Sequence, residues 1–495
     1  MKPLSMILFL LIILLVNSSS QAMDPPVKMW EKWYYTSYDE AKFFDIELTP
    51  AGFLFVSGAV SEYWVDGQNL HPALLLDIDG NVIWDIDSPW YGIVAYDGAI
   101  TQDSSFIITG TSVVTSSDTY SLFIMKISQE GSIEWSKVYD YPDTKEEGYG
   151  ITCLPDGGFA VVGRVHGTGN YHGKAWILRT DAQGDTLWTE TWGTVNTNWG
   201  KSILYANDML CVLANGADST QTTYGTHLLF YDLDGEYLGG SDYSNLYLYE
   251  PGDFCPASDG GLTFVTNTLP VIWHTDEYGE TLWWHNIPEP FGSGTNHEGF
   301  CIRQTMDSGY VFSGWGGETP EWDSSPDLAV PHAVDSILDT QDGWLARYDS
   351  EGDLQWSFQN CTGTTNHFYS VTQLPEGGYM ACGTWGWSGG GYLVRYAPET
   401  GIEVEALSPS PEMAVSPNPF SSSLSINFEI PESDLVELSI YDLSGRLVEN
   451  LISGSVSSGE HLSAWNPGGS VPAGCYIAKL ITSGESRYVR CVYLK

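Results

Sequence analysis

One sequence unit of roughly 50 residues recurs along most of this chain, and its punctuation is Asp-x-x-Gly-x-x-x-Trp. Clear or near copies are Asp77/Gly80/Trp84, Ser128/Gly131/Trp135, Asp181/Gly184/Trp188, Asp276/Gly279/Trp283 and Asp349/Gly352/Trp356, and Asp232/Gly235 lacks the Trp. A repeat of this length built from short strands is typical of a ring of four-stranded blades. We therefore predict an all-β chain whose main part, residues 23–401, is a seven-bladed β-propeller.

Each unit has the same internal plan. The third contains strand-like runs at 148–154, 159–164 and 175–180 before its Trp strand, which makes four strands. In Asp-x-x-Gly the Asp side chain can cap its own turn, and we favour this structural role over metal binding. The Trp positions are interpreted as packing positions of the repeat: Trp30, Trp84, Trp135, Trp188, Trp283 and Trp356.

The two ends of the repeat array predict how the ring closes. The last unit ends near residue 405 without its Trp, whereas the chain begins with a spare Trp strand at 29–35. We expect this strand to pair as the outermost strand of the last blade, which leaves no open seam between the first and last blades.

Composition limits the possible functions. The chain has 63 Asp and Glu residues against 19 Lys and Arg, with a formal net charge of −44. Nucleic acids and anionic membranes attract clustered Lys and Arg, so neither is an expected partner. Residues 1–22 have the pattern of a secretory signal, with Lys2, an apolar run at 6–16 and a small-residue site ending at Ala22. That run is too short to span a bilayer and no later segment is apolar enough, so we expect an exported protein without membrane insertion.

The eight cysteines are scattered along the chain. Cys475 and Cys491 lie on two strands joined by a turn near residue 483, so a disulfide and two separate apolar core positions both remain open. The other six are expected to be small buried apolar residues: Cys153, Cys211, Cys255, Cys301, Cys361 and Cys382.

The repeat stops after residue 401, and we assign 402–413 to a linker and 414–495 to a second domain. Its short alternating strands predict a small β-sandwich. Its motifs include Pro417-Asn418-Pro419-Phe420, Ile440-Tyr441-Asp442 and Ala473-Gly474-Cys475-Tyr476. This stretch resembles the C-terminal sorting domain of the type IX secretion system, which is immunoglobulin-like, and is similar also to the flagellar-hook-capping immunoglobulin-like domain.

That resemblance implies an interaction with the type IX secretion machinery. It also implies a route through the periplasm of a Gram-negative-type bacterium to a secreted or outer-surface location. A structural immunoglobulin-like module without an address function is the alternative, since folds alone do not fix roles.

The Trp motif is similar to the docking motif of quinoprotein dehydrogenases, but it is one residue shorter between Asp and Gly. No two cysteines are adjacent, as they commonly are near the quinone in those enzymes. We therefore expect no organic cofactor. A serine nucleophile elbow, a His-Glu-x-x-His helix and a Gly-rich phosphate loop are also absent from the sequence.

An acidic insertion interrupts the sixth unit between residues 314 and 343, with seven carboxylates and no Lys or Arg. Long loops on rigid scaffolds often carry function. Oxygen ligands suit Ca²⁺, so Asp323, Asp327 and Asp335 are candidate calcium ligands.

The loops that enter the first strands and those that follow the second strands should open on the same face of the ring. Aromatic rings beside Asn and His suit sugars, whose apolar faces stack while their hydroxyls need hydrogen-bond partners. The candidate ligand-binding residues on this face are Asn296, His297, Asn366, His367, Trp199, Trp315, Trp385 and Trp387. The alternative interpretation is that these residues form strand-entry turns and blade packing.

Together these features predict a secreted or cell-surface binding or adhesion protein with an extracellular glycan or protein ligand. One alternative is a carbohydrate-active hydrolase or lyase that uses carboxylates of the insertion with His297 or His367. Another is a purely structural surface component. The sequence does not decide whether any reaction is catalysed.

Overall fold

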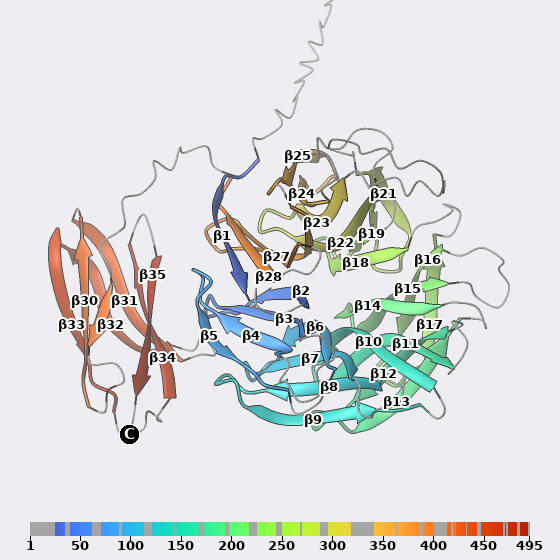
Figure 1. Ribbon diagram of the computed structural model, residues 1–495, viewed down its shortest axis with the longest axis horizontal. Coiled ribbons are helices and arrows are strands. Elements are labelled where there is room, and N and C mark those ends of the chain that lie inside the picture. Colours follow the sequence, from blue (N-terminus) through green and yellow to red (C-terminus); the bar gives the residue numbers. More distant parts are fainter. Residues whose placement is uncertain are drawn as a thin grey trace, which may run out of the picture.

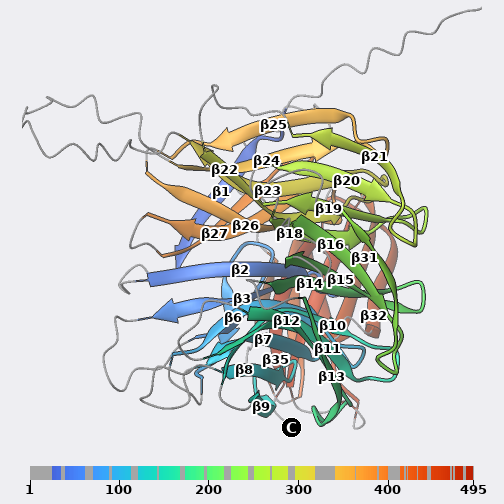
Figure 2. The same ribbon diagram turned by 90° about the vertical axis from the view of Figure 1, so that its right-hand side faces the viewer.

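The computed structural model describes residues 25–34, 40–61, 71–88, 92–112, 121–141, 144–167, 173–193, 198–216, 225–243, 250–267, 270–287, 296–317, 341–362, 364–386, 390–399, 413–416, 420, 422–431, 433–442, 447–468, 471, 474–482 and 486–493. Every regular element within these residues is a β-strand (Figures 1 and 2). None of the described residues belongs to a helix that could cross a membrane.

Seven four-stranded antiparallel sheets occupy the described residues between Lys28 and Tyr396, arranged in chain order around a centre (Figure 1). The first three are β2 (Glu40–Leu48), β3 (Leu54–Ser61), β4 (Ala73–Leu76) and β5 (Val82–Asp85); β6 (Val94–Ile100), β7 (Phe106–Ser112), β8 (Ser121–Ile127) and β9 (Ile133–Tyr139); and β10 (Thr144–Cys153), β11 (Phe159–Gly167), β12 (Gly173–Thr180) and β13 (Thr186–Trp192). The next two are β14 (Trp199–Ala206), β15 (Met209–Gly216), β16 (Gly225–Tyr231) and β17 (Tyr237–Asp242); and β18 (Pro251–Pro256), β19 (Leu262–Thr266), β20 (Val271–Thr275) and β21 (Thr281–Asn286). The last two are β22 (Asn296–Gln304), β23 (Tyr310–Gly317), β24 (Asp342–Tyr348) and β25 (Leu354–Asn360); and β26 (Asn366–Gln373), β27 (Tyr379–Trp385), β28 (Gly391–Tyr396) and β1 (Lys28–Tyr34). The predicted all-β propeller is confirmed.

The ring closes as predicted. Strand β1 pairs antiparallel with β28, and Trp30 lies opposite Arg395. The order β1-β28-β27-β26 makes the first strand of the chain the outermost strand of the last sheet. The N-terminal segment thus supplies a strand that the end of the array lacks.

The Asp of the repeat motif caps its own turn, as expected. In the first copy, Asp77 Oδ1 accepts hydrogen bonds from the backbone N–H of Asp79 (3.0 Å) and of Asn81 (2.8 Å). The same pair of bonds recurs at Asp181, Asp232, Asp276 and Asp349. In each copy, the Asp carboxylate accepts both hydrogen bonds from backbone N–H groups of its own turn. This capping role explains why Asp occupies the position and requires no metal.

The Trp of each motif packs on the turn of the next sheet rather than on its own. A Cβ placed on Gly131, whose φ is +82°, would lie 2.8 Å from the ring of Trp84. Trp84 Nε1 also donates to the Gln129 carbonyl (2.9 Å) in that turn. Equivalent contacts join Trp30 to Gly80, Trp135 to Gly184, Trp188 to Gly235 and Trp283 to Gly352. Glycine therefore supplies both the left-handed turn and a flat seat for the neighbouring indole.

The cysteine expectations are partly corrected. Cys491 is a free, buried thiol, and the register places it opposite Tyr476 while Cys475 lies opposite Val492, so the two cysteines do not face each other. Among the other six, Cys361 is exposed and Cys153 is half-buried, whereas the remaining four are buried as expected.

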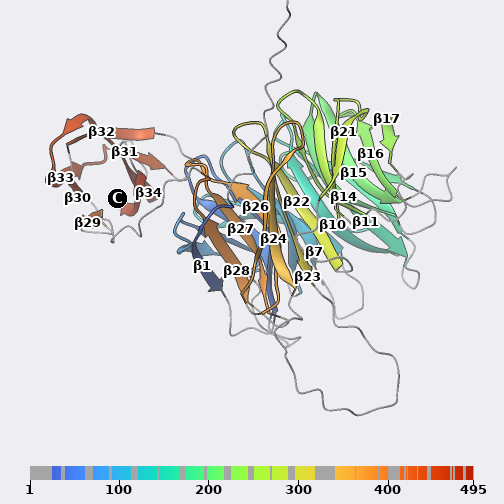
Figure 3. The same ribbon diagram turned by 90° about the horizontal axis from the view of Figure 1, so that it is seen from above.

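The C-terminal residues form two sheets of their own (Figure 3). One contains β29 (Ala414–Ser416), β30 (Leu424–Ile430) and β33 (Gly459–Trp465), and the other contains β31 (Asp434–Asp442), β32 (Leu447–Val456), β34 (Gly474–Ile481) and β35 (Ser486–Tyr493). Their core includes Phe420, Leu438 and the fully buried Trp465, whose Nε1 donates to Glu449 (3.1 Å). This two-sheet architecture confirms the predicted immunoglobulin-like sandwich.

Candidate functional site in the central channel

All seven inner strands carry an irregularity at the same place. The register between each inner strand and its neighbour shifts at Phe43/Asp45, Ala95/Asp97, Gly148/Gly150, Gly200/Ser202, Pro251/Asp253, Gly299/Cys301 and Phe368/Ser370. A β-bulge of this kind places two residues of one strand opposite a single partner and re-aims their side chains. The seven aligned bulges therefore turn one layer of side chains, with one residue from each inner strand, toward the centre of the ring.

The residue skipped at each shift lines the central channel, and five of the seven are aromatic: Phe44, Tyr96, Tyr149, Phe300 and Tyr369. Their rings contact one another in series, with centroids 4.9 Å apart for Phe300–Tyr369, 5.2 Å for Tyr369–Phe44, 5.2 Å for Phe44–Tyr96 and 5.4 Å for Tyr96–Tyr149. We call these five residues the aromatic collar. It is interrupted on one side, where β14 supplies Lys201 and β18 supplies Gly252.

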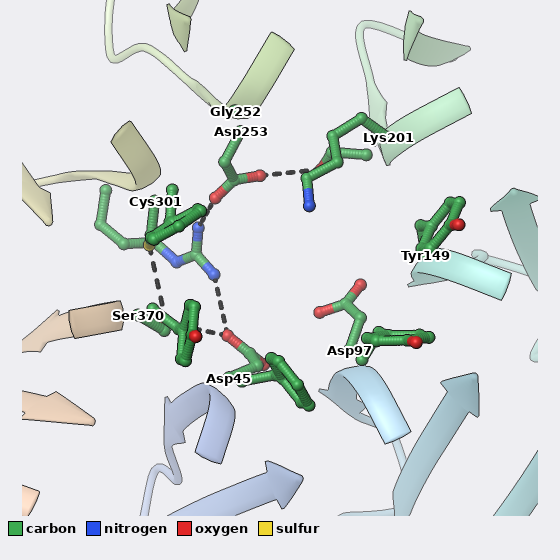
Figure 4. A pocket seen from close by; sticks show the side chains of 14 residues that line it. Asp45, Asp97, Tyr149, Lys201, Gly252, Asp253, Cys301 and Ser370 are labelled. Atoms are coloured by element: carbon green, nitrogen blue, oxygen red, sulfur yellow. Dashed lines mark hydrogen bonds and ion pairs between the residues drawn. The ribbon is translucent and has the colours of Figure 1, made fainter. Parts of the chain in front are cut away.

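Polar side chains share a cavity of about 90 Å³ with the collar (Figure 4). They come from the inner strands of several sheets: Asp45 from β2, Asp97 from β6, Lys201 and Ser202 from β14, Asp253 from β18, Arg303 from β22 and Ser370 from β26. The channel thus combines aromatic side chains with charged groups of both signs.

Arg303 is surrounded by carboxylates. Its guanidinium pairs with Asp45 (3.3 Å), with Glu47 (3.5 Å) and, through a short contact, with Asp253. Ser370 donates to Asp45 (3.0 Å) and Ser202 donates to Asp253 (2.8 Å). Desolvation and the neighbouring Asp45 raise the pKa of Glu47 to about 7, because one guanidinium does not neutralise three acids.

Asp97 and Lys201 stand apart from this ion-pair group. Asp97 Oδ2 accepts from the backbone N–H of Ile151 (2.7 Å), while burial and the charge of Asp45 raise the pKa of Asp97 well above its usual value. Lys201 Nζ lies 6.0 Å from the centroid of Tyr149, and burial lowers the pKa of its ammonium. Within the described part of the chain, neither side chain forms an ion pair with the other, although both face the cavity (Figure 4).

A second ring of residues lies two positions before each residue of the collar layer, at or just before the start of the inner strand, and so on the same side of the chain. We call it the mouth layer; the residues that matter here are Lys42, Glu147, Trp199, Glu250, Glu298 and His367. Hydrogen bonds connect it to the collar, since Tyr149 Oη donates to Glu147 (2.7 Å) and His367 Nδ1 lies 3.4 Å from Tyr369 Oη. The collar and the mouth layer are therefore successive rings of one channel.

His367 and Trp315 form the main aromatic pair at the mouth. Their rings stack with centroids 4.9 Å apart and planes 18° apart. His367 Nε2 lies 2.8 Å from Gln341 Oε1, and Trp315 Nε1 donates to Glu298 (3.3 Å). Desolvation, with a further contribution from Lys42, lowers the pKa of His367 to about 4, so this imidazole is neutral near pH 7.

The sequence-predicted residues lie at this end of the ring, with different exposures. The register places Trp385 opposite Asn366 and Trp315 opposite Glu298, at the ends of second strands and the starts of first strands. Trp199, Trp385 and His367 are half-buried, whereas Trp315 and His297 are buried.

Asn366 is fully buried. Its Oδ1 accepts from the N–H of Gly343 (2.9 Å), and its Nδ2 donates to Asp342 (2.9 Å) and to the Asn360 carbonyl (3.1 Å). The amide is occupied in holding the last two sheets together, so Asn366 is not kept among the ligand-binding residues.

The side chain of Asn296, all of Trp387, and Asp323, Asp327 and Asp335 lie outside the described residues. Within the described residues, no group of three or more His, Cys, Asp or Glu side chains is placed to hold a metal ion.

Sequence reasoning missed the collar, Asp97, Lys201 and Arg303. A signal was present, because the aligned inner strands read FFD, AYD, GYG, GFC and FYS, with an aromatic residue before a small or acidic one. Alternation alone assigns only one of two successive residues to the channel. The bulge that brings both to the same side is visible only in the register of the sheets.

Comparisons with known proteins add an assignment for one domain. Residues 414–493 match the family described as the secretion system C-terminal sorting domain. This domain is the type IX sorting tail, and it indicates export to the outer surface or the medium in Bacteroidetes-type bacteria.

A comparison with curated proteins found no match. Similar solved structures include a protein of unknown function from Bacteroides caccae (14% identity, TM-score 0.39, 62% of this chain and 93% of that chain) and Sqt1 from Chaetomium thermophilum (12%, 0.42, 72% and 82%). A third is YCF48 bound to D1 peptide (10%, 0.43, 77% and 99%). These similarities are too weak to carry an argument about activity or ligand.

Proposed function

We propose that this chain is an exported binding protein that takes an extracellular glycan at the mouth of its propeller channel. The observation that carries the proposal is the succession of the mouth layer and the aromatic collar. Trp199, Trp385 and His367 are half-buried at this end of the ring, and the mouth layer also contains the carboxylates Glu147, Glu250 and Glu298. Sugar rings need this combination of stacking surfaces and hydrogen-bond acceptors.

The proposed function also requires that the chain is exported. Residues 1–22 would direct the chain across the inner membrane into the periplasm, and the sorting domain would then engage the type IX secretion machinery. The propeller would act at the cell surface or in the medium.

A protein ligand at the same mouth remains the alternative within the binding class. It predicts retention by surface proteins rather than by polysaccharides. A purely structural role predicts neither.

The experiment is to incubate the purified mature chain, from residue 23 onward, with a panel of polysaccharides and to follow both retention and polymer length. Retention at unchanged length supports the proposal. The matched variants are Trp199→Ala at the mouth and Trp284→Ala on an outer strand, where the ring is 45% exposed. Loss of retention in Trp199→Ala alone places the ligand at the mouth, and equal retention by both variants contradicts that location.

One observation favours a second candidate, a glycoside hydrolase or lyase. Partial desolvation and the neighbouring Glu298 carboxylate raise the pKa of Glu250, as expected for an acid–base pair. Shortening of a polymer in the same assay, abolished by Glu250→Gln, would establish the enzyme.

A further inference from the structure

Two ionisable side chains that line the channel cavity beneath the mouth form no ion pair with any of the residues that the structure describes. The carboxyl of Asp97 and the ammonium of Lys201 both face this cavity (Figure 4). Tyr149 lies between them along the ring, contacting Tyr96 on one side and Lys201 on the other. Arg303 is already engaged by three carboxylates and needs no ligand.

The charges of the cavity select against ionic ligands. An anion would approach the carboxylates of Asp45 and Asp253, which line the cavity and already share the guanidinium of Arg303. A cation would approach the ammonium of Lys201. A neutral group with one hydrogen-bond acceptor and one donor meets neither repulsion, and it can bind both the Lys201 ammonium and the Asp97 carboxyl, whose Oδ2 already accepts from the Ile151 N–H.

The size of the cavity and its aromatic lining further restrict the class of ligand group that it can hold. A cavity of about 90 Å³ has room for several water molecules, since one water needs about 10 to 15 Å³ on the same measure. It therefore admits a group of a few heavy atoms and leaves a whole sugar ring at the mouth. The collar offers aromatic faces to a methyl group.

We propose that this cavity holds the acetamido group of an N-acetylated sugar whose ring rests at the mouth. The carbonyl oxygen accepts from Lys201 Nζ, the amide N–H donates to the Asp97 carboxyl, and the methyl group packs against the collar. A protonated Asp97 still has an accepting oxygen, so the arrangement holds when that acid is neutral. The inference rests on the proposed glycan site and names the sugar class that the site selects.

The test compares two ligands that differ only in this group: β-1,4-linked tetramers of N-acetylglucosamine and of glucose, titrated into the mature full-length chain by calorimetry. We expect the acetylated tetramer to bind at least tenfold more tightly. Asp97→Ala, which removes the accepting oxygen, and Lys201→Met, which removes the donor, should each bring the two affinities to within about twofold. Lys137→Met makes the same chemical change on the outer strand β9, where Lys137 pairs with Asp185, and should keep the preference.

A measurement on the unmodified chain removes dependence on the folding of the variants. Saturation-transfer NMR with the acetylated tetramer should give the strongest transfer to the acetyl methyl protons, because the collar surrounds them. Equal affinity for the two tetramers, or transfer spread evenly over the sugar protons, overturns the acetamido assignment while the glycan site stands. Failure of both tetramers to bind overturns the assignment, and it contradicts the proposed function if the polysaccharide panel is also negative.

Discussion

At the scale of single residues, the most informative contact is the one between an indole and a glycine of the next sheet. Trp356 shows the same role with a different partner, because its Nε1 donates to Glu399 (2.8 Å) and its ring is 3% exposed. Where the fourth sheet has Gly239 in the Trp position, Tyr243 Oη still reaches the Gly279 carbonyl (2.6 Å). The residues of the repeat motif are therefore those that form the contacts between neighbouring sheets.

Truncating a buried Trp of the motif should cost far more stability than truncating an exposed one. We expect Trp356→Ala to lower the free energy of unfolding by about 3 to 5 kcal/mol, since a large buried ring leaves a cavity. Trp284→Ala should lower it by about 1 kcal/mol, because that ring is 45% exposed and, among the described residues, stacks on Trp273. Urea denaturation of the two variants measures both values, and similar losses would contradict the packing role.

Two glycine substitutions can distinguish the contribution of the indole contact from that of the left-handed backbone. Gly131 (φ +82°) and Gly260 (φ +92°) have similar left-handed backbones, but only Gly131 has an indole within 3 Å of an added Cβ. Alanine at either position should cost about 1 to 2 kcal/mol for the backbone. Gly131→Ala should cost about 1 to 3 kcal/mol more because Trp84 must shift. Equal thermal stability of the two variants would show that the indole yields without cost.

At the scale of elements, the ring depends on a strand that is far away in sequence. Strand β1 joins β28 across the whole propeller, and Tyr34 Oη donates to the Gly80 carbonyl (2.5 Å) of the first sheet. One short segment therefore completes the last sheet and fastens it to the first.

Deleting β1 should open this seam. A chain that begins at residue 36 should melt at a markedly lower temperature and aggregate, because the edge of β28 is left unpaired. A chain that begins at residue 25 is the control and should melt like the mature protein. Adding a synthetic peptide of residues 25–36 to the shortened chain should restore part of the stability, and no effect of the peptide would argue against specific closure.

At the scale of the whole molecule, the channel concentrates carboxylates that come from separate sheets. Asp45, Asp97 and Asp253 come from three sheets whose inner strands line one channel, and burial raises the pKa of Asp45 and of Asp97. The folded chain therefore holds protons that the unfolded chain releases at lower pH. Such groups make stability fall as the pH rises.

Glu47 allows this effect to be measured. Its pKa rises from about 4.5 to about 7 on folding, so its contribution to stability is retained below pH 4.5 and lost progressively up to pH 7. Relative to the original chain, Glu47→Gln should gain stability across that interval and change little below it. Unfolding free energies of both proteins at several pH values provide the test, and a constant difference from pH 4 to pH 8 would contradict the raised pKa.

The sequence by itself determined the repeat, its strands, its turn chemistry and the closing strand. These features depend on local rules: Gly for a left-handed turn, Asp for a capped turn and period-two alternation for strands. The sorting domain could also be predicted from the sequence, because its motifs lie in one continuous stretch. The sequence also predicted that His367, Trp315 and Trp385 lie at one end of the ring, and their role in binding stays a prediction.

Only the tertiary structure decided which side chains meet. Trp84 and Gly80 are neighbours in sequence, yet Trp84 packs on Gly131, because adjacent sheets are offset around the ring. Asn366 looked available for a ligand but is fully buried, and Asp97 and Lys201 looked ordinary but share a cavity. Aligned bulges and ring closure bring residues from different sheets to one centre, and the alternation of a single strand does not show that convergence.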